Sequence, residues 1–121
     1  MNLEEQLQEF LKVADAKTAE SYREHNFTFE SPPRHKIEMG RNWARVVVTR
    51  ERNGSWTTTS VYAFVAVKEF YNKTLGRVRT GDIHKAASFK IPAKHARGNI
   101  FVAGWEDNLT PYGIVYLKPL W

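Results

Sequence analysis

One segment of the chain concentrates side chains that could bind an anion. Residues 77–101 contain six Lys or Arg and a single acid, Asp82, so their local charge of +5 equals the net charge of the whole chain. A phosphate needs only a cationic donor within reach, so cations spread along one segment can follow a nucleic-acid backbone. The candidate anion-binding residues are Arg77, Arg79, Lys85, Lys90, Lys94, His95 and Arg97, and Phe89 is the candidate for stacking on a base.

Two less specific interpretations of this segment stay open. It can be a basic solvated face with Phe89 buried, or a docking surface for an acidic protein. Solvated faces normally mix charges of both signs, whereas these cations have almost no counter-charge beside them in the sequence and are interleaved with His84, Phe89 and His95. Such a basic segment favours an anionic partner, namely nucleic acid or a nucleotide.

Motifs for other chemistry are missing from the sequence. The four His do not form a metal-binding pair, the chain has no Cys, and we find no nucleophile, phosphate-loop or calcium-loop motif. We therefore predict a binding protein rather than an enzyme, with no catalytic residues, no cofactor and no metal. No apolar run reaches the ~20 residues of a membrane span, and we expect neither a signal peptide nor a membrane location.

The first element that the pattern predicts is an amphipathic helix over residues 2–24. Its apolar stripe and its start are typical of a helix, because Asn2 and Glu5 have the spacing of a capping box. The stripe can pack on the core of its own domain or on a partner chain. The residues of the stripe are Leu3, Leu7, Phe10, Leu11, Ala14 and Tyr22.

A loop with two prolines and a β-hairpin should follow the helix. Pro32 and Pro33 disfavour regular structure, so we predict a loop over residues 26–42. Asn53-Gly54 is the preferred pair for a two-residue hairpin turn between two β-rich runs. The turn predicts the pairs Arg52 with Ser55, Thr49 with Thr58 and Val46 with Val61. One face of this hairpin would then collect Trp43, Val47, Trp56, Tyr62 and Phe64.

The pattern of the remaining chain predicts a meander of short strands. The second hairpin strand should continue to about Tyr71, and further strands are predicted over residues 83–87, 100–105 and 114–117. Pro92 and Gly98 are typical of the start and end of a short helical turn, in which Lys94 and Arg97 would share one face.

Several of these segments resemble a known group of sequences. The motifs GDI-x-KAAS at residues 81–88 and PAKHARGNI at residues 92–100, with SVYAFV at 60–65 and PYG at 111–113, are similar to a family of small bacteriophage proteins of unassigned function. The resemblance covers residues 43–117. It implies a viral origin and no particular activity, and a binding role fits it because small phage accessory proteins often bind host or defence components.

We therefore expect an α+β fold in which an N-terminal amphipathic helix packs on a mostly antiparallel sheet of about five strands. Residues 1–121 should form a single domain with a helix (1–25), a proline-containing loop (26–42) and a β-rich body (43–121). The predicted function is that of a phage accessory protein, acting in the host cytoplasm, that binds nucleic acid through the strand-plus-turn segment 77–97. A nucleotide-sequestering protein with a site at a homodimer interface, and an anti-defence protein that inhibits a host protein, remain as alternatives.

Overall fold

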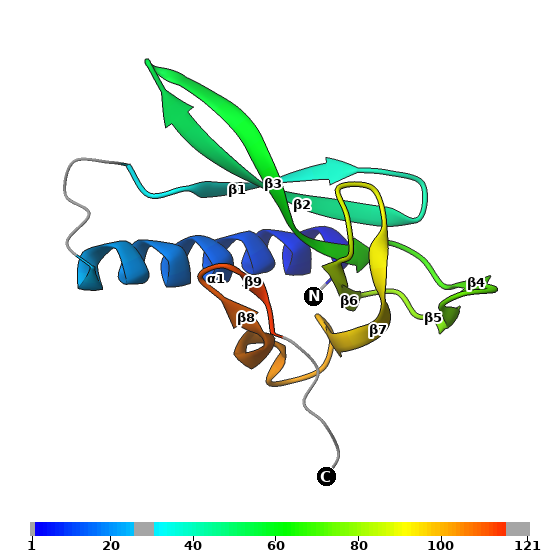
Figure 1. Ribbon diagram of the computed structural model, residues 1–121. Helices are drawn as coiled ribbons and strands as arrows, with labels where there is room; N and C mark the ends of the chain where they lie inside the picture. The colour runs from blue at the N-terminus through cyan, green and yellow to red at the C-terminus, as the bar shows by residue number, and fades with distance from the viewer. Residues whose placement is uncertain (1, 26–30, 116–121) are drawn as a thin grey trace, which may run out of the picture.

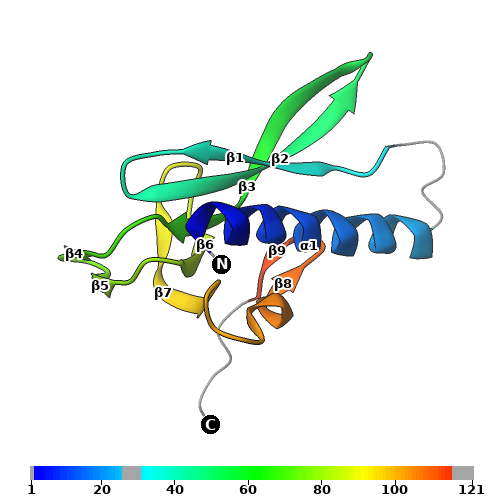
Figure 2. The ribbon, with the colours of Figure 1, turned by 180° about the vertical axis from the view of Figure 1, so that it is seen from behind.

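A long helix lies across one face of a five-stranded antiparallel sheet in the computed structural model, which describes residues 2–25 and 31–115. Figure 1 views the sheet from the side away from the helix, and Figure 2 shows the helix in front. The strand order is β1-β2-β3-β6-β7. This confirms the predicted α+β arrangement. The elements of the main layers are α1 (Leu3–Glu24), β1 (Arg34–Met39), β2 (Trp43–Arg52), β3 (Ser55–Ala66), β6 (Asp82–Ala86) and β7 (Pro92–Asn99).

Two small strand pairs and one short helical turn complete the described chain. Their bounds are β4 (Phe70–Asn72), β5 (Gly76–Val78), η1 (Trp105–Asn108), β8 (Leu109–Thr110) and β9 (Gly113–Ile114). β4 pairs with β5 at one end of the sheet, and β8 pairs with β9 beside α1.

The amphipathic stripe of α1 packs on its own core, as one of the two interpretations proposed. The Asn2 side chain accepts a hydrogen bond from the Glu5 N–H at 2.9 Å, which confirms the predicted start of the helix. Phe10 is fully buried, stacked on Trp105 at 5.7 Å between ring centroids and edge-on to Tyr62 at 6.0 Å. The helix therefore joins the sheet to the C-terminal segment.

The hairpin of β2 and β3 confirms the predicted register only near its turn. Arg52 faces Ser55 and Thr49 faces Thr58, but two register shifts follow, so Val46 faces Ala63 instead of Val61. The extra residues of β3 are Thr59 and Tyr62, and bulges of this kind redirect side chains. Tyr62 consequently packs against the helix rather than joining Trp43 and Phe64, and its hydroxyl donates to the Thr110 carbonyl oxygen at 2.6 Å.

Four further predictions, which concern the helices and strands, are wrong. Within the described part of the loop predicted over 26–42, residues 34–39 form β1, which pairs along its whole length with β2. The helical turn predicted at 92–97 is strand β7, because the antiparallel pairing with β6 overrides the local preference and an edge strand tolerates Pro at its first position.

The other two errors concern strand ends. β3 ends at Ala66, and residues 70–72 belong to the separate pair β4 and β5. No strand forms at residues 100–105, since Gly104 has a left-handed φ of 90° and leads into η1. The predicted strand 83–87 is confirmed as β6, whereas the strand predicted at 114–117 is reduced to β9, and residues 116–117 lie outside the described part of the chain.

Candidate functional site

The predicted basic segment does not form one patch in space. Arg77 is paired with Glu69 at the β4–β5 pair, with 2.7 Å between Nε and Oε1. Lys85 and Arg97 each donate at 3.1 Å to backbone carbonyl oxygens of residues 114–115. These three cations are therefore engaged in contacts within the protein itself.

The remaining candidates are exposed but lie on different elements. Arg79 lies in the turn before β6, and Lys94 and His95 lie on the edge strand β7. Because residues 92–97 form a strand, Lys94 and Arg97 do not share a helical face as predicted. Lys90 and Phe89 lie together at the tip of the β6–β7 hairpin.

That hairpin tip crosses the face of the sheet turned away from α1, which we call the open face (Figure 1). The opposite face is identified by His35, whose ring contacts Asp15 of α1 at 2.7 Å, and by the main core cluster. Successive side chains of a strand point to opposite faces, and paired residues point to the same face. The register therefore shows which residues lie on the open face. From β1, β2 and β3 it carries Arg34, Lys36, Glu38, Trp43, Arg45, Val47, Thr49, Glu51, Trp56, Thr58, Val61 and Phe64.

Arg45 connects the sheet to the hairpin tip. Its Nε and Nη2 donate to Glu38 Oε1 at 3.1 and 2.8 Å, and its Nη1 donates to the Phe89 carbonyl oxygen at 3.1 Å. The guanidinium carbon lies 4.5 Å from the centroid of the Phe89 ring, within the range of a cation–π contact. Phe89 nevertheless remains 48% exposed, so the ring is held in place and still available to a partner.

A second pair of Arg and aromatic ring lies further along the same face. The Arg34 guanidinium carbon is 5.0 Å from the centroid of the Trp56 ring, which is 39% exposed. Trp56 belongs to the end of the β2–β3 hairpin, where residues 50–60 are all exposed and project beyond the rest of the sheet (Figure 1). The open face therefore presents two rings, each with a cation against it.

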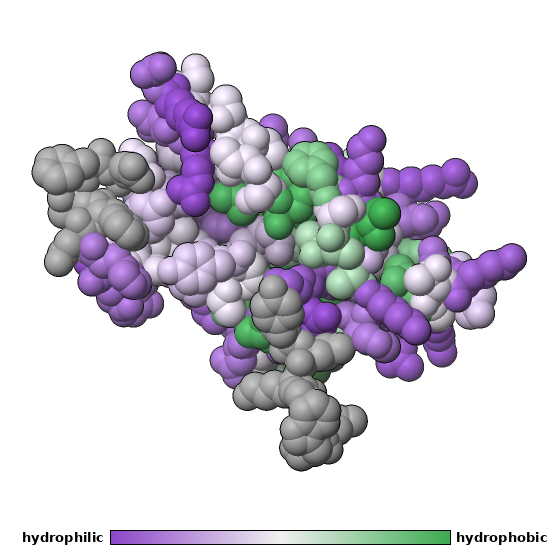
Figure 3. Space-filling view, in the orientation of Figure 1, coloured by the Kyte–Doolittle hydropathy of each residue, from purple (hydrophilic) through white to green (hydrophobic). Residues whose placement is uncertain are grey.

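Cations outnumber acids on this part of the surface. The basic side chains are Arg34, Lys36, Arg41, Arg45 and Lys90, and the acids on the open face of β1–β3 are Glu38 and Glu51. Figure 3, which shows this face, has a patch of hydrophobic residues near the β6–β7 hairpin with hydrophilic residues around it. A surface of this composition suits a partner that offers both negative charge and flat apolar groups.

His84 is buried beneath the open face, where it packs against Trp43, and it is not available to bind an anion. Its ring is buried, it contacts the Ala93 carbonyl oxygen at 2.7 Å through Nδ1, and it lies 5.1 Å from the Trp43 ring. Burial lowers the pKa of His84, and the nearby charges of Arg97 and His95 lower it further, against the opposing effect of Ala93 and Asp82. A neutral His84 is therefore a packing residue at neutral pH.

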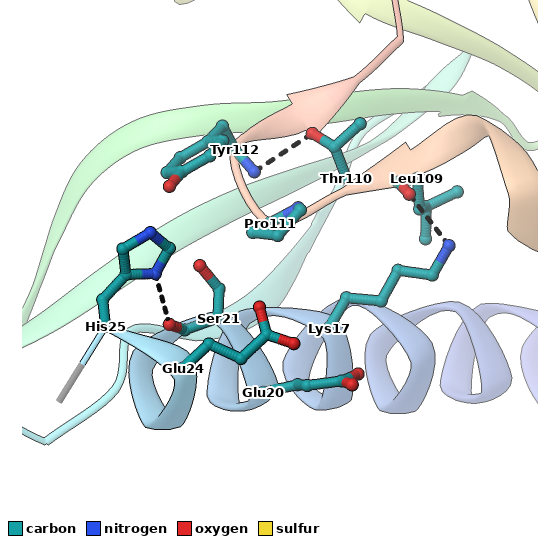
Figure 4. A pocket seen from close by; sticks show the side chains of 9 residues that line it. All are labelled: Lys17, Glu20, Ser21, Glu24, His25, Leu109, Thr110, Pro111 and Tyr112. Carbon is teal, nitrogen blue, oxygen red and sulfur yellow. Dashed lines mark hydrogen bonds between the residues drawn. The ribbon is translucent and has the colours of Figure 1, made fainter. Parts of the chain in front are cut away.

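A depression in the described structure lies on the other side of the molecule and does not suit an anion. It has a volume of about 520 Å³ and lies between the C-terminal half of α1 and the turn from β8 to β9 (Figure 4). Lys17 donates to the carbonyl oxygens of Glu106 and Leu109 at 2.5 and 2.9 Å. The other titratable side chains that line it are Glu20, Glu24 and His25, and the two carboxylates repel an anion.

Sequence reasoning missed four residues of the open face: Arg34, Lys36, Arg45 and Trp56. Arg34 and Lys36 have the i, i+2 spacing that puts two side chains on one face of a strand, and this signal was hidden by the assignment of the segment to a loop. Within residues 2–25 and 31–115, no group of three His, Asp or Glu could hold a metal ion, and no helix is long and apolar enough to cross a membrane.

Comparison with known proteins yields one match. The model of a family of unknown function (DUF7717) matches residues 1–109. No curated protein and no solved structure matches the chain. The match includes the N-terminal helix, and it leaves the phage origin suggested by residues 81–100 as an expectation.

Proposed function

Since the chain belongs to this family of unknown function (DUF7717), we propose an activity from its own surface: it binds nucleic acid through the open face of the sheet. The observation that carries the proposal is the pair of Arg–aromatic contacts, Arg34 with Trp56 and Arg45 with Phe89, on a face that α1 leaves uncovered. This moves the predicted interface from the segment 77–97 to β1–β3 and the β6–β7 tip. Phe89 and Lys90 are retained from the sequence prediction.

The geometry of the face fits a nucleic-acid backbone. Arg34 lies opposite Thr49 and Glu38 lies opposite Arg45, so the two Arg–aromatic pairs are about four residues apart along β2, or roughly 13 Å. Lys36 lies between them, opposite Val47. Such a distance corresponds to several nucleotides, since one strand of a duplex has a phosphate every ~3.4 Å of its helix axis.

The exposed rings supply the second part of the recognition. Stacking of a base on an aromatic side chain contributes about 1–3 kcal/mol and tolerates any base, because every base has a π face. A ring that only filled the core would be buried, whereas Phe89 and Trp56 retain 48% and 39% of their exposure. The combination favours a nucleic acid over a purely ionic partner.

The test compares two variants that lose the same charge at different places. The first replaces Arg34, Lys36 and Lys90 by Ala, and the control replaces by Ala the residues Lys73, Arg77 and Arg79, which lie around the β4–β5 pair and outside β1–β3 and the β6–β7 tip. Binding to a labelled oligonucleotide is followed by fluorescence anisotropy at several salt concentrations. We expect the first variant to lose about two to three units from the slope of log K against log salt, because each phosphate contact contributes roughly 0.7–0.9.

The control should keep most of its affinity and slope. Equal losses in the two variants would show that the chain attracts nucleic acid only through its net charge, and a slope near zero in the wild type would remove the proposal. A chain that captures a host protein from nuclease-treated lysate, and no nucleic acid, would instead act as the inhibitor considered above. The phage origin and the host cytoplasm belong to the same proposal, and co-purification with material absorbing at 260 nm is its simplest first check.

A further inference from the structure

A depression of about 290 Å³ lies at the end of the open face where β1 turns into β2. Its lining comes from the turn residues 40–42 and from Glu38, Met39, Trp43, Arg45 and Phe64. The volume is at the lower limit of small-ligand sites, so it suits one nucleotide and not a larger molecule. Because it adjoins Arg45, it continues the surface on which Phe89 lies.

The apolar wall of the depression is a rigid indole. Trp43 contacts Phe64, Phe70 and His84 at centroid distances of 6.0, 5.5 and 5.1 Å, each nearly perpendicular to it. Three such contacts prevent the indole from changing its orientation. Trp43 is nevertheless only partly buried, so the ring presents some of its surface to the depression.

The polar wall contains a carboxylate fixed by an Arg. Glu38 receives both hydrogen bonds from Arg45 on one oxygen, Oε1. A carboxylate has about four acceptor sites, two on each oxygen, so the two sites on Oε2 remain available. Glu38 is an acceptor only, so it selects a ligand that offers donors.

A cation completes the depression at its rim. Arg41 is exposed in the turn and makes no hydrogen bond or ion pair with any of the described residues. A cation at this position can neutralise the phosphate of a nucleotide whose base lies against Trp43.

We propose that this depression is a binding site for a single guanine nucleotide unit, with the base against Trp43, its N1–H and N2–H donating to Glu38, and its phosphate near Arg41. Guanine is the base whose Watson–Crick edge offers two adjacent donors to a carboxylate, whereas thymine and uracil offer one. The inference rests on the proposed function in that the site lies on the same nucleic-acid-binding face, and it adds a preferred base to that function.

The experiment uses thymidine octamers in which one central position carries guanine, hypoxanthine or adenine. We expect the guanine octamer to bind about tenfold more tightly than the all-thymidine one, as is typical of one good bidentate contact. Hypoxanthine lacks the N2 amino group and should fall between guanine and adenine. Free GMP and UMP are titrated in parallel, with the indole N–H resonance of Trp43 as the readout and that of Trp56 as the reference.

Two variants of equal charge separate the site from the rest of the face. Glu38→Gln keeps an acceptor for Arg45 but loses the carboxylate, so the preference for guanine should disappear while binding of the thymidine octamer persists. Glu51→Gln removes an acid of the same face far from the depression and should keep the preference.

The outcomes are distinct for the two proposals. Equal binding of guanine and thymidine octamers by the wild type, or a guanine preference that survives Glu38→Gln, would overturn the guanine site and leave the proposed function intact. If no octamer binds, the proposed function fails. The guanine site is then supported if GMP shifts the Trp43 resonance and UMP does not, and it is overturned if GMP causes no shift.

Discussion

Replacement of Arg45 by Met should loosen the hairpin tip that carries Phe89 and lower the stability of the whole protein. Met keeps an apolar stem over the sheet and loses every charged contact of the Arg. The lost contacts are two hydrogen bonds to Glu38, one to the Phe89 carbonyl oxygen, and the cation–π contact with the Phe89 ring.

The size of the effect follows from the exposure of these groups. The side chains of Arg45 and Glu38 are 26% and 37% exposed, so solvent screens the ion pair and it contributes at most about 1 kcal/mol. The hydrogen bond to the carbonyl oxygen adds about 1 kcal/mol, and the cation–π contact about 0.5–1 kcal/mol. Because all of them share one side chain they do not add fully, and we expect a loss of about 2 kcal/mol, or roughly 8 °C in Tm for a chain of this size.

Thermal and urea unfolding, followed by circular dichroism, measure this loss. The matched control is Arg77→Met, which breaks an ion pair with Glu69 whose side chains are 64% and 55% exposed, and should cost no more than about 0.5 kcal/mol. The double variant with Phe89→Ala should lose clearly less than the sum of the single losses. If Arg45→Met costs no more than the control, Arg45 does not hold the hairpin tip, and the arrangement of the open face described above is wrong.

Three further predictions concern the core and its supports. Phe10→Ala should lower the free energy of unfolding by about 3–5 kcal/mol, because the ring is fully buried between Tyr62 and Trp105, and urea titration measures it. Asn2→Ala should cost about 1 kcal/mol in the same assay through the lost N-cap, and Asn2→Asp should not. Burial lowers the pKa of His84 below the value of about 6.5 expected in the unfolded chain, so the unfolded state takes up the proton first as the pH falls. The contribution of His84 to stability should therefore be complete above about pH 6.5 and decline below it, and His84→Gln should flatten this decline.

The helix and the central hairpin were accessible from the sequence because their signals are local. The cap at Asn2 and the 3.6-residue spacing of Leu7, Phe10 and Ala14 define the helix without reference to the rest of the chain. Asn53 and Gly54 both adopt positive φ, of 52° and 81°, as the predicted turn requires. Pairs near this turn follow directly from it.

The errors lie where pairing with a distant strand decides the conformation. The edge strand β1 has few β-formers and follows two prolines, yet the whole of it pairs with β2. β7 has no β-branched residue at all, and its pairing with β6 still keeps it extended. No residue pattern in the sequence indicates the two bulges of β3, so the pairing of β2 with β3 beyond Thr49 could not be predicted.

The same physics explains why a cluster of charge along the chain is not a cluster in space. Alternation along β6 directs Lys85 toward the α1 side, where it binds a carbonyl oxygen of the C-terminal segment, while its neighbour His84 points to the open face. Conversely, Arg34 and Lys36 are two residues apart on one strand and Arg45 lies on the next, so all three share a face although eleven residues separate Arg34 from Arg45. A binding surface on a sheet is therefore better sought among cations at i, i+2 spacing on strands whose register is known than in the segment of highest local charge. In this chain that criterion selects the face that also carries the two exposed rings.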